Sequence, residues 1–456
     1  MSNTLMISVS GMRGHVGTDL TPELVARHAA ALGAWVRLTA AQRPTVVLGR
    51  DARTSGPMFA HAAFAGLMSV GVDVVDLGIV PTPTVQLAVE HHHAGAGLIL
   101  TASHNPIEWN ALKFVGPDGI FLDAADGERV RQLAEQGPPR MGWEGIGEVR
   151  TDTEAIRRHL DAIVGLPLID VTAIRKRRFH IALDCVRGAG ATAMLPLLER
   201  LGCRVSGIKL EIDGRFPRAP EPVPENLGEL GELVRNTGAD LGFAVDPDVD
   251  RLAVVDEKGR AIGEDYTLAF AVRAVLDGRS SAGKDPVVVV NLSTSLVVED
   301  AARAGGAKFL RAPVGEANVA RAIRDEGAVI GGEGNGGVML PALHIGRDAP
   351  LGVALILHLL AANGVRVSEL VESSPRYTIV KAKGPRGPEL RPLYDRLRRR
   401  FAEAEADERD GLRLSWPDRW LHVRPSGTEP IVRLIAEAPS PDAAEALIAA
   451  AREHLQ

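Results

Sequence analysis

The sequence predicts an α/β protein of several domains. Apolar strand-like runs alternate with amphipathic helical stretches, which is the pattern of stacked parallel-sheet units. The chain has 456 residues, 45% of them hydrophobic and 24% charged, which is enough for several domains with substantial cores. The order strand, turn, helix, strand recurs along the chain. We therefore expect three topologically related α/β units, although the sequence identity between them is faint.

The first unit is expected to begin with a strand that leaves into Arg50-Asp51-Ala52-Arg53. Its predicted elements are strands over Thr45–Gly49, Asp73–Leu77 and Ala96–Leu100 and a helix over Pro57–Ser69. The last of these strands runs directly into Thr101-Ala102-Ser103-His104-Asn105-Pro106. A hydroxyl group, that of Ser103, therefore stands at the end of a strand, where a serine can also simply organise a turn.

The later units repeat this pattern, and the tail departs from it. The predicted elements of these units are strands over Phe179–Asp184, Val205–Ile208, Leu252–Val255 and Pro286–Asn291, a helix over Ser295–Ala304 and a strand at Phe309. In the tail, an Ala-rich helix over Pro441–Leu455 follows strands at Trp420–Val423 and Ile431–Ala436.

Turn and linker signals place the domain boundaries. Gly137-Pro138-Pro139 and the charged stretch after it end the first domain near Asp152. A turn at Asp256–Gly259 marks the second junction, and a third lies near Val371–Arg376. The predicted domains are therefore 1–152, 153–255, 256–370 and 371–456.

Composition excludes several classes of function. The net charge is −6 and the basic residues are dispersed, so no nucleic-acid partner is expected. No leader segment or membrane span is apparent, and we expect a soluble, cytoplasmic protein. Cys185 and Cys203 are too few for a disulfide framework and are expected to pack in the interior. The run His91-His92-His93 can bind a metal, but a solvated helix end is the favoured interpretation.

Three alternating carboxylates indicate a cation site. In an extended segment the side chains of Asp246, Asp248 and Asp250 project the same way and converge on one hard cation. A calcium loop is the alternative, with Glu257 at its twelfth position, but Arg251 occupies the sixth, where the turn needs glycine. A hydroxyl at a strand end and a distant carboxylate triplet together suggest phosphoryl chemistry.

Four motifs appear in a fixed order along the chain. They are Thr101–Pro106, Asp246–Arg251, Gly332-Glu333-Gly334-Asn335-Gly336-Gly337 and Arg424-Pro425-Ser426-Gly427-Thr428-Glu429-Pro430. With these motifs the chain resembles the α-D-phosphohexomutase family over essentially its whole length. The resemblance implies four domains around a central cleft: three α/β units with mixed sheets, and a smaller C-terminal α+β domain.

The resemblance also implies the roles of the reacting groups. Ser103 carries a phosphoryl group as phosphoserine, gives it to a sugar monophosphate and recovers phosphate from the other end of a bisphosphosugar. Mg²⁺ is expected on Asp246, Asp248 and Asp250, with the Ser103 phosphate completing its shell. Arg251 and Arg13 are expected near the transferring phosphate, although Arg251 can instead pair with the aspartates.

The residues that depart from the family pattern lie in the segments for proton transfer and sugar recognition. Lys113 matches the proposed base, although Ala111 replaces the usual glycine nearby, and His104 is expected to position the phosphoserine. Glu333 and Asn335 are expected to bind sugar hydroxyls. Gly337 stands where many relatives have histidine. Either His344 or Lys113 substitutes for that histidine, or its role is absent.

The last motif is expected to hold the phosphate that does not react. The groups concerned are Arg424, Ser426, Gly427 and Thr428, with added charge from Arg433. The predicted substrate is glucosamine phosphate, with a bisphosphorylated sugar as activator and a bifunctional phosphomannomutase/phosphoglucomutase as the alternative. A metal-dependent sugar phosphatase and a noncatalytic sugar-phosphate sensor are the rivals from other classes. A monomer and a homodimer are both compatible with the sequence.

Overall fold

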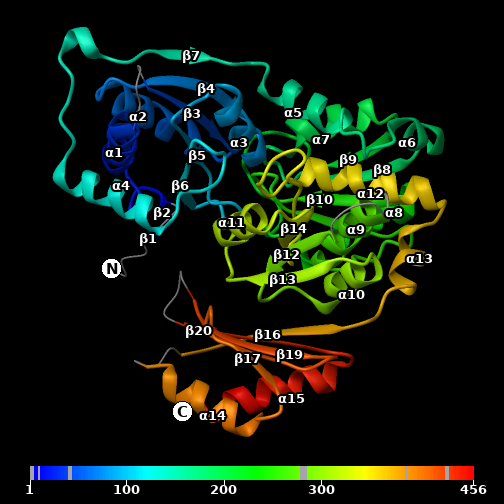
Figure 1. Ribbon diagram of the computed structural model, residues 1–456. Coiled ribbons are helices and arrows are strands. Elements are labelled where there is room, and N and C mark those ends of the chain that lie inside the picture. The colour runs from blue at the N-terminus through cyan, green and yellow to red at the C-terminus, as the bar shows by residue number, and fades with distance from the viewer. Residues whose placement is uncertain are drawn as a thin grey trace.

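A computed structural model describes residues 5–8, 11–39, 44–277, 285–385, 389–426 and 431–455. Figure 1 shows the first domain in blue and cyan beside the green and yellow second and third domains, with the orange and red C-terminal domain below them. The fold is the predicted one, with three α/β domains followed by a smaller α+β domain. Within the described ranges, no helix is both long enough and apolar enough to cross a membrane.

The first domain is built on a seven-stranded mixed sheet with the order β1-β2-β6-β5-β3-β4-β7. Its strands are β1 (Met6–Ser8), β2 (Gly11–His15), β3 (Thr45–Arg50), β4 (Asp73–Ile79), β5 (Ala96–Leu100), β6 (Trp109–Val115) and β7 (Val149–Thr151). Its helices are α1 (Pro22–Thr39), α2 (Gly56–Met68), α3 (Thr82–His91) and α4 (Ala124–Gln136). The helices α1, α2 and α4 share one apolar core, and α3 packs on the other face of the sheet.

The second and third domains have four-stranded sheets with the orders β11-β10-β8-β9 and β13-β12-β14-β15. Their strands are β8 (His180–Asp184), β9 (Arg204–Ile208), β10 (Leu241–Val245), β11 (Leu252–Val255), β12 (Val287–Asn291), β13 (Lys308–Ala312), β14 (Ile330–Glu333) and β15 (Gly337–Met339). In each sheet three parallel strands are joined by an antiparallel fourth, and β4-β3-β5-β6 of the first domain repeats this order. The three units therefore share one topology, as expected.

One apolar core runs through the second and third domains. Their helices are α5 (Ala155–Val164), α6 (Val171–Arg177), α7 (Gly190–Arg200), α8 (Gly228–Thr237), α9 (Glu264–Asp277), α10 (Leu296–Ala304), α11 (Glu316–Glu326), α12 (Ala349–Asn363) and α13 (Val367–Glu372). The helix α12 is apolar and buried along most of its length, as expected for a helix enclosed on all sides. It contacts α5, α6, α7 and α9, so it joins the two domains into one body.

The C-terminal domain is an antiparallel sheet with the order β16-β20-β19-β18-β17. Its strands are β16 (Thr378–Pro385), β17 (Glu405–Asp407), β18 (Leu412–Ser415), β19 (Trp420–Pro425) and β20 (Ile431–Ala438), and its helices are α14 (Arg391–Arg400) and α15 (Pro441–Arg452). The helix α15 begins with Pro441 after Ser440, whose hydroxyl accepts the backbone N–H of Ala443.

The two cysteines are buried or half-buried, and the run His91–His93 lies at the end of α3. Cys185 is buried and Cys203 half-buried, both with free thiols, and burial raises the pKa of Cys203 to about 12. Both thiols are therefore poor nucleophiles where they lie. His91 is exposed and is the last residue of α3, and His92 contacts Asp152 at 2.8 Å.

Candidate active site

The shared topology of the three units places three of the motifs at equivalent positions. In each unit the hairpin between the third parallel strand and its antiparallel neighbour carries a motif. The register pairs that close these hairpins are Leu100 with Leu112, Val245 with Leu252, and Glu333 with Gly337. The carboxyl ends of parallel strands are where α/β folds bind ligands. Ser103 and the aspartate triplet, far apart in sequence, meet at the junction of the first two domains.

Ser103 is held in a strained conformation with its hydroxyl against the aspartate loop. Its φ is 49°, in the left-handed region that non-glycine residues rarely adopt. Its backbone N–H donates to Thr101 Oγ1 at 2.9 Å. The buried Ser103 Oγ donates to Asp246 Oδ2 at 2.8 Å, across 143 residues of sequence. This contact joins the candidate phosphate carrier to the candidate metal loop.

Arg53, to which the sequence assigned no role, fixes the backbone of the Ser103 loop. Its side chain is fully buried, and its Nε donates to Asp51 Oδ2 at 3.0 Å. The two terminal nitrogens donate to four loop carbonyls, those of Ser103 (2.7 Å), Asn105 (2.6 Å), Pro106 (2.6 Å) and Trp109 (2.8 Å). A guanidinium has donors in a rigid planar fork, so one side chain holds the whole turn.

The aspartate triplet has the properties of a site for a hard cation. Oxygens of Asp246, Asp248 and Asp250 lie within 4.8 Å of one another, and all three residues are buried. Burial, with Asp250 and Asp248, raises the pKa of Asp246 well above its ordinary value. Asp248 Oδ1 and Asp250 Oδ1 are buried without a hydrogen-bond partner. Unpartnered, crowded carboxylate oxygens fit a bound divalent cation, which the donor set favours as Mg²⁺ or Ca²⁺.

The loop around the triplet is not a calcium hand. Asp246 Oδ1 accepts the backbone N–H groups of Asp250 and Arg251, both at 3.2 Å, and the chain then enters β11. The Glu257 carboxylate, at the twelfth position, accepts hydrogen bonds from Ser368 instead of facing the triplet. The structure therefore removes the calcium-loop alternative.

Two of the predicted positively charged side chains, those of Lys113 and Arg251, form ion pairs with the aspartate triplet. Lys113 Nζ is 2.8 Å from Asp248 Oδ2 and 3.9 Å from Asp250 Oδ2. Burial acts to lower the pKa of Lys113, but Asp248 and Asp250 outweigh it and raise that pKa above its ordinary value. Lys113 is therefore protonated here, and it can act as a base only after this contact is lost. Arg251 pairs with Glu221 at 2.9 Å and lies 3.8 Å from Asp250.

Arg13 and His104 flank the Ser103 loop. Arg13 Nη1 donates to Asn105 Oδ1 at 2.6 Å. His104 Nδ1 lies 3.5 Å from Ser103 Oγ. Burial, with Arg251 and Arg13, lowers the pKa of His104 well below its ordinary value. The imidazole is therefore neutral near pH 7 and can accept or donate a hydrogen bond beside Ser103.

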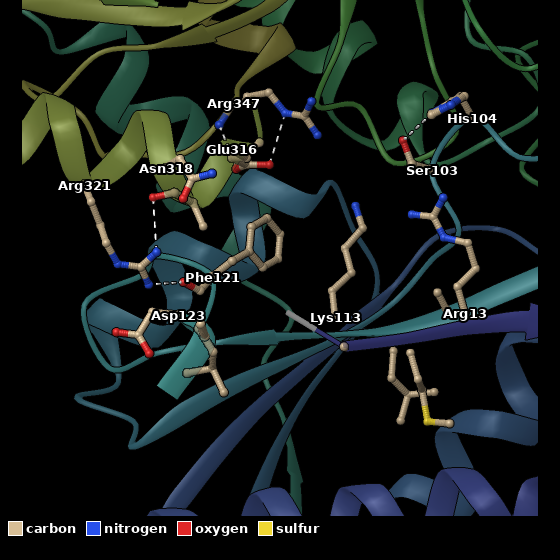
Figure 2. A pocket seen from close by; sticks show the side chains of 18 of the residues that line it. Arg13, Ser103, His104, Lys113, Phe121, Asp123, Glu316, Asn318, Arg321 and Arg347 are labelled. Atoms are coloured by element: carbon tan, nitrogen blue, oxygen red, sulfur yellow. Dashed lines mark hydrogen bonds and ion pairs between the residues drawn. The ribbon is translucent and has the colours of Figure 1, made fainter. Parts of the chain in front are cut away.

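These side chains line one cavity of about 540 Å³. Arg13, Ser103, His104, Lys113 and Arg251 contribute from the first two domains, as Figure 2 shows for four of them. The third domain adds Glu316, Asn318, Arg321 and Arg347, none of which the sequence assigned to the site. Such a cationic, partly enclosed cavity suits an anionic substrate of sugar size.

The predicted sugar ligands lie behind this cavity wall rather than on it. Glu333 is buried, and its Oε1 accepts from Asn291 Nδ2 at 2.8 Å and from the Gly315 N–H at 3.1 Å. Its Oε2 accepts from Arg347 Nη1 at 2.9 Å. Asn335 Oδ1 is buried without a hydrogen-bond partner.

The predicted phosphate segment is described in part. Arg424 and Ser426 lie at the end of β19, and Gly427 and Thr428 lie outside the described residues. Arg424 Nε donates to Asp410 Oδ2 at 2.9 Å, and Arg433 is its cross-strand neighbour. Among the residues that the structure describes, none of the C-terminal domain lines the 540 Å³ cavity.

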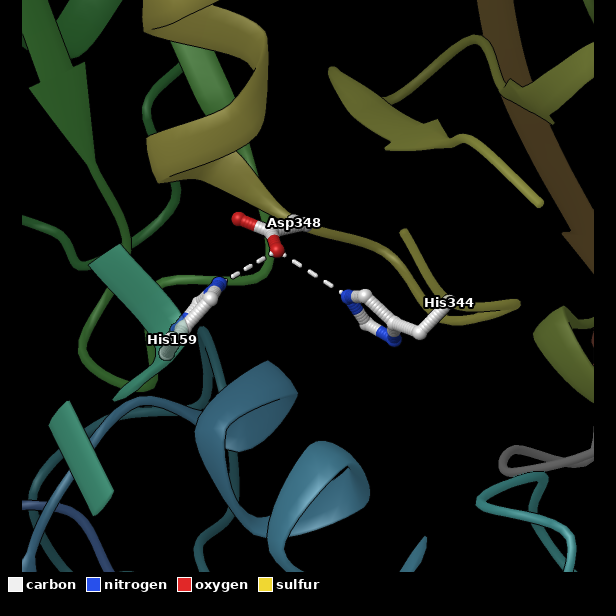
Figure 3. Close-up of side chains that lie close together, drawn as sticks. All are labelled: His159, His344 and Asp348. Atoms are coloured by element: carbon white, nitrogen blue, oxygen red, sulfur yellow. Dashed lines mark hydrogen bonds and ion pairs between the residues drawn. The ribbon is translucent and has the colours of Figure 1, made fainter. Parts of the chain in front are cut away.

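His344 lies in a buried cluster with Asp348 and does not line the cavity. Figure 3 shows His344 and His159 both pointing at Asp348. Their Nε2 atoms lie 3.0 Å and 2.7 Å from Asp348 Oδ2, which are hydrogen-bond distances. Thr84 Oγ1 lies 2.9 Å from His159 Nδ1. This buried cluster joins the first three domains, and it is not part of the cavity lining.

The comparisons with known proteins agree with this geometry. Models of phosphoglucomutase/phosphomannomutase alpha/beta/alpha domains I, II and III match residues 5–140, 157–259 and 263–377, and the C-terminal domain matches 380–454. A phosphoglucomutase/phosphomannomutase of Thermococcus kodakarensis is 39% identical over 439 residues, covering 95% of this chain and 94% of the relative. A probable phosphoglucosamine mutase of Methanopyrus kandleri is 39% identical over 442 residues, covering 96% and 95%.

A solved structure shows the same arrangement of domains. The crystal structure of a phosphoglucomutase/phosphomannomutase family protein from Burkholderia thailandensis superposes with a TM-score of 0.86 at 27% identity, covering 100% of this chain and 97% of that one. The fold and the matched domains thus define a phosphotransferase isomerase, an enzyme that moves a phosphoryl group within a sugar phosphate. The chain belongs to the phosphoglucomutase/phosphomannomutase family, and it is a phosphohexomutase.

Proposed function

We propose that this protein interconverts hexose 6-phosphates and 1-phosphates through a phosphoserine at Ser103 and a bisphosphosugar, with glucosamine phosphate as its preferred substrate. The observation that carries the proposal is the 2.8 Å contact between Ser103 Oγ and Asp246 Oδ2 at the wall of a cationic cavity. A hydroxyl held against a carboxylate triplet and facing arginine and lysine side chains suits a reversible phosphoryl carrier.

The proposed cycle has two transfers. In the first, the bond from phosphorus to Ser103 Oγ breaks and a bond to a sugar hydroxyl oxygen forms, while the hydroxyl proton passes to a base and the released Ser103 oxygen takes up a proton. The bisphosphosugar then turns around in the cavity. In the second, Ser103 Oγ gives up its proton and bonds to the phosphorus of the other phosphoryl group, whose bond to the sugar oxygen breaks. That oxygen takes up a proton, which leaves the isomeric monophosphate and restores the phosphoserine. A bisphosphorylated sugar activates the enzyme because it can phosphorylate an empty Ser103.

Asp246, Asp248 and Asp250 would hold Mg²⁺ together with the phosphate on Ser103. When bound, the cation supplies neutralisation of charge on the phosphoryl oxygens. Arg13 and Arg251 face the same cavity and would bind the transferring phosphate. Glu333 and Asn335 would bind sugar hydroxyls once Glu333 exchanges its present contacts behind the cavity wall for the substrate. Arg424, Ser426, Gly427, Thr428 and Arg433 would hold the second phosphate once the C-terminal domain moves over the cavity.

The choice of sugar rests on relatives of equal similarity. One relative at 39% identity is named a probable phosphoglucosamine mutase and another a phosphoglucomutase/phosphomannomutase. The alternative is therefore a bifunctional phosphomannomutase/phosphoglucomutase. Turnover of glucosamine, mannose and glucose 1-phosphates, each with its own bisphosphate activator, decides between them: the highest kcat/KM is expected for the glucosamine compound.

The phosphoserine is tested by intact-mass measurement. Purified protein is expected to carry one phosphate on Ser103 in a fraction of molecules, and Ser103→Ala is expected to lose both that mass and turnover. Ser373→Ala, in the exposed end of α13, is the matched control and should keep both. Full mutase activity in Ser103→Ala would refute the mechanism. Release of free phosphate at a rate rivalling isomerisation would instead favour a metal-dependent sugar phosphatase.

A further inference from the structure

Arg347 connects the metal loop to two carboxylates of the third domain. Its Nη2 donates to Asp250 Oδ2 at 2.5 Å and its Nη1 to Glu333 Oε2 at 2.9 Å. Its Nε lies 3.0 Å from Glu316 Oε2. The side chain is buried and lines the cavity, and Figure 2 shows it beside Glu316. One guanidinium therefore meets carboxylates from three separate segments.

Gly337 is glycine because the Arg347 stem passes through the space of its side chain. A Cβ added at Gly337 would lie 2.3 Å from Arg347 Cδ and 2.8 Å from Arg347 Cγ, closer than real contacts allow. The backbone gives no other reason, since Gly337 is not among the glycines with positive φ, whereas Gly336 next to it has a φ of 86°. A histidine at position 337 and this placement of Arg347 are mutually exclusive.

We propose that Arg347 is a positioning residue: it orients Asp250 toward the cation and couples the Glu333 carboxylate, behind the cavity wall, to the metal loop. Arg347 occupies Asp250 Oδ2, whereas the buried Asp250 Oδ1 has no hydrogen-bond partner and has only the Arg251 ion pair at 3.8 Å, so Oδ1 is the oxygen that would meet a cation. It also holds Glu333 Oε2, while Glu333 Oε1 accepts from Asn291 and from the Gly315 N–H. The inference rests on the proposed function for the identity of the ligands.

Charge explains why this residue is an arginine. Asp250, Glu316 and Glu333 would repel one another if they were left alone in the interior. The planar fork of arginine presents several N–H groups to several carboxylates at once, which a lysine ammonium does not reproduce. Arg347→Lys keeps the charge and loses the geometry, so it separates the two contributions.

A double-mutant cycle between positions 337 and 347 tests the proposal. The probe is Mn²⁺, whose binding is followed by EPR and needs no turnover. Arg347→Ala and Gly337→Ala are each expected to raise the Mn²⁺ dissociation constant by about tenfold or more. The double variant should bind Mn²⁺ about as Arg347→Ala does, because the added Cβ no longer meets a stem. Both single variants should also raise the KM for the sugar phosphate.

The controls separate this inference from the proposed function. Arg260→Met removes an arginine paired with Asp256 outside the cavity, and Gly142→Ala adds a Cβ where nothing lies within 4 Å, so neither should alter Mn²⁺ binding. If Arg347→Ala does not fold, Arg347→Lys and Gly337→Ala carry the test. Wild-type Mn²⁺ affinity and KM in Gly337→Ala, or independent additive effects, would overturn the role of Arg347. If the wild-type enzyme did not use the phosphoserine cycle, the proposed function would be wrong instead.

Discussion

At the scale of single residues, two buried arginines organise the site in different ways. Arg53 donates mainly to backbone carbonyls and shapes the Ser103 loop, whereas Arg347 donates to carboxylates and joins domains. Asp51 is buried beside Arg53 and also accepts from Thr101 Oγ1 at 2.7 Å. Burial raises the pKa of Asp51, although Arg53 acts to lower it. The strained Ser103 conformation thus depends on an ion pair that never faces the substrate.

Replacement of Arg53 by Met should therefore damage both stability and turnover. The change leaves Asp51 and four loop carbonyls without their donor, and breaking a buried pair costs about 3–5 kcal/mol. Urea unfolding measures the loss. Arg50→Met is the matched control, because within the described residues the Arg50 side chain makes a single hydrogen bond, from Nη1 to the Asp51 carbonyl at 3.3 Å. Equal unfolding midpoints for the two variants would contradict this account of the loop.

At the scale of elements, the sequence predicted β5, β11, β19 and β20 beside the motifs to within a residue or two, but not β6, β10, β14 or β15. Periodic apolar runs such as Ala96–Leu100 and Leu252–Val255 are local signals, and they are strands in the structure. The contacts of Arg53 and Arg347 were not predictable in this way. Arg347 meets Asp250 across 97 residues, and Arg53 meets Ser103 across 50, so no local pattern records either contact.

The helix α12 provides a second test at this scale. Its N-cap, Asp348, accepts the Leu351 N–H at 2.9 Å and the Nε2–H groups of His159 and His344 on its other oxygen. Asp348→Ala loses the cap and leaves two buried imidazole Nε2–H groups without their acceptor, at a cost of about 3–6 kcal/mol. Asp170→Ala removes an exposed cap of α6 and should cost only about 1 kcal/mol. A similar shift in Tm for both variants would show that the histidines contribute nothing.

At the scale of the whole molecule, one loop connects the C-terminal domain to the sugar motif. Ser293 Oγ lies 2.8 Å from His422 Nδ1, and Glu437 accepts the Leu296 N–H at 2.8 Å. Asn291, at the start of this loop, donates to Glu333 Oε1 at 2.8 Å. A short series of hydrogen bonds therefore connects the C-terminal domain to Glu333.

Acid should weaken this docking through His422. Its Nε2–H donates to the Asp410 carbonyl at 2.7 Å, so Nδ1 must stay unprotonated to accept from Ser293. Burial lowers the pKa of His422 to about 4. The unfolded chain binds this proton near pH 6.5 and the folded one does not. Stability is therefore lost as pH falls from about 6.5 to 4, by about 3 kcal/mol at pH 4.

The measurement is the free energy of unfolding against pH for the wild type and His422→Asn. Asparagine keeps a neutral polar group without a titrating nitrogen, so this part of the pH slope should disappear in the variant. His61→Asn, on the surface of α2, is the control and should follow the wild-type slope. The protection of the amides of residues 293–296 against hydrogen exchange, relative to their intrinsic rate at each pH, should fall in the wild type over the same pH interval, because those residues hold the C-terminal domain. Parallel pH profiles for wild type and His422→Asn would rule out the histidine as the group that titrates.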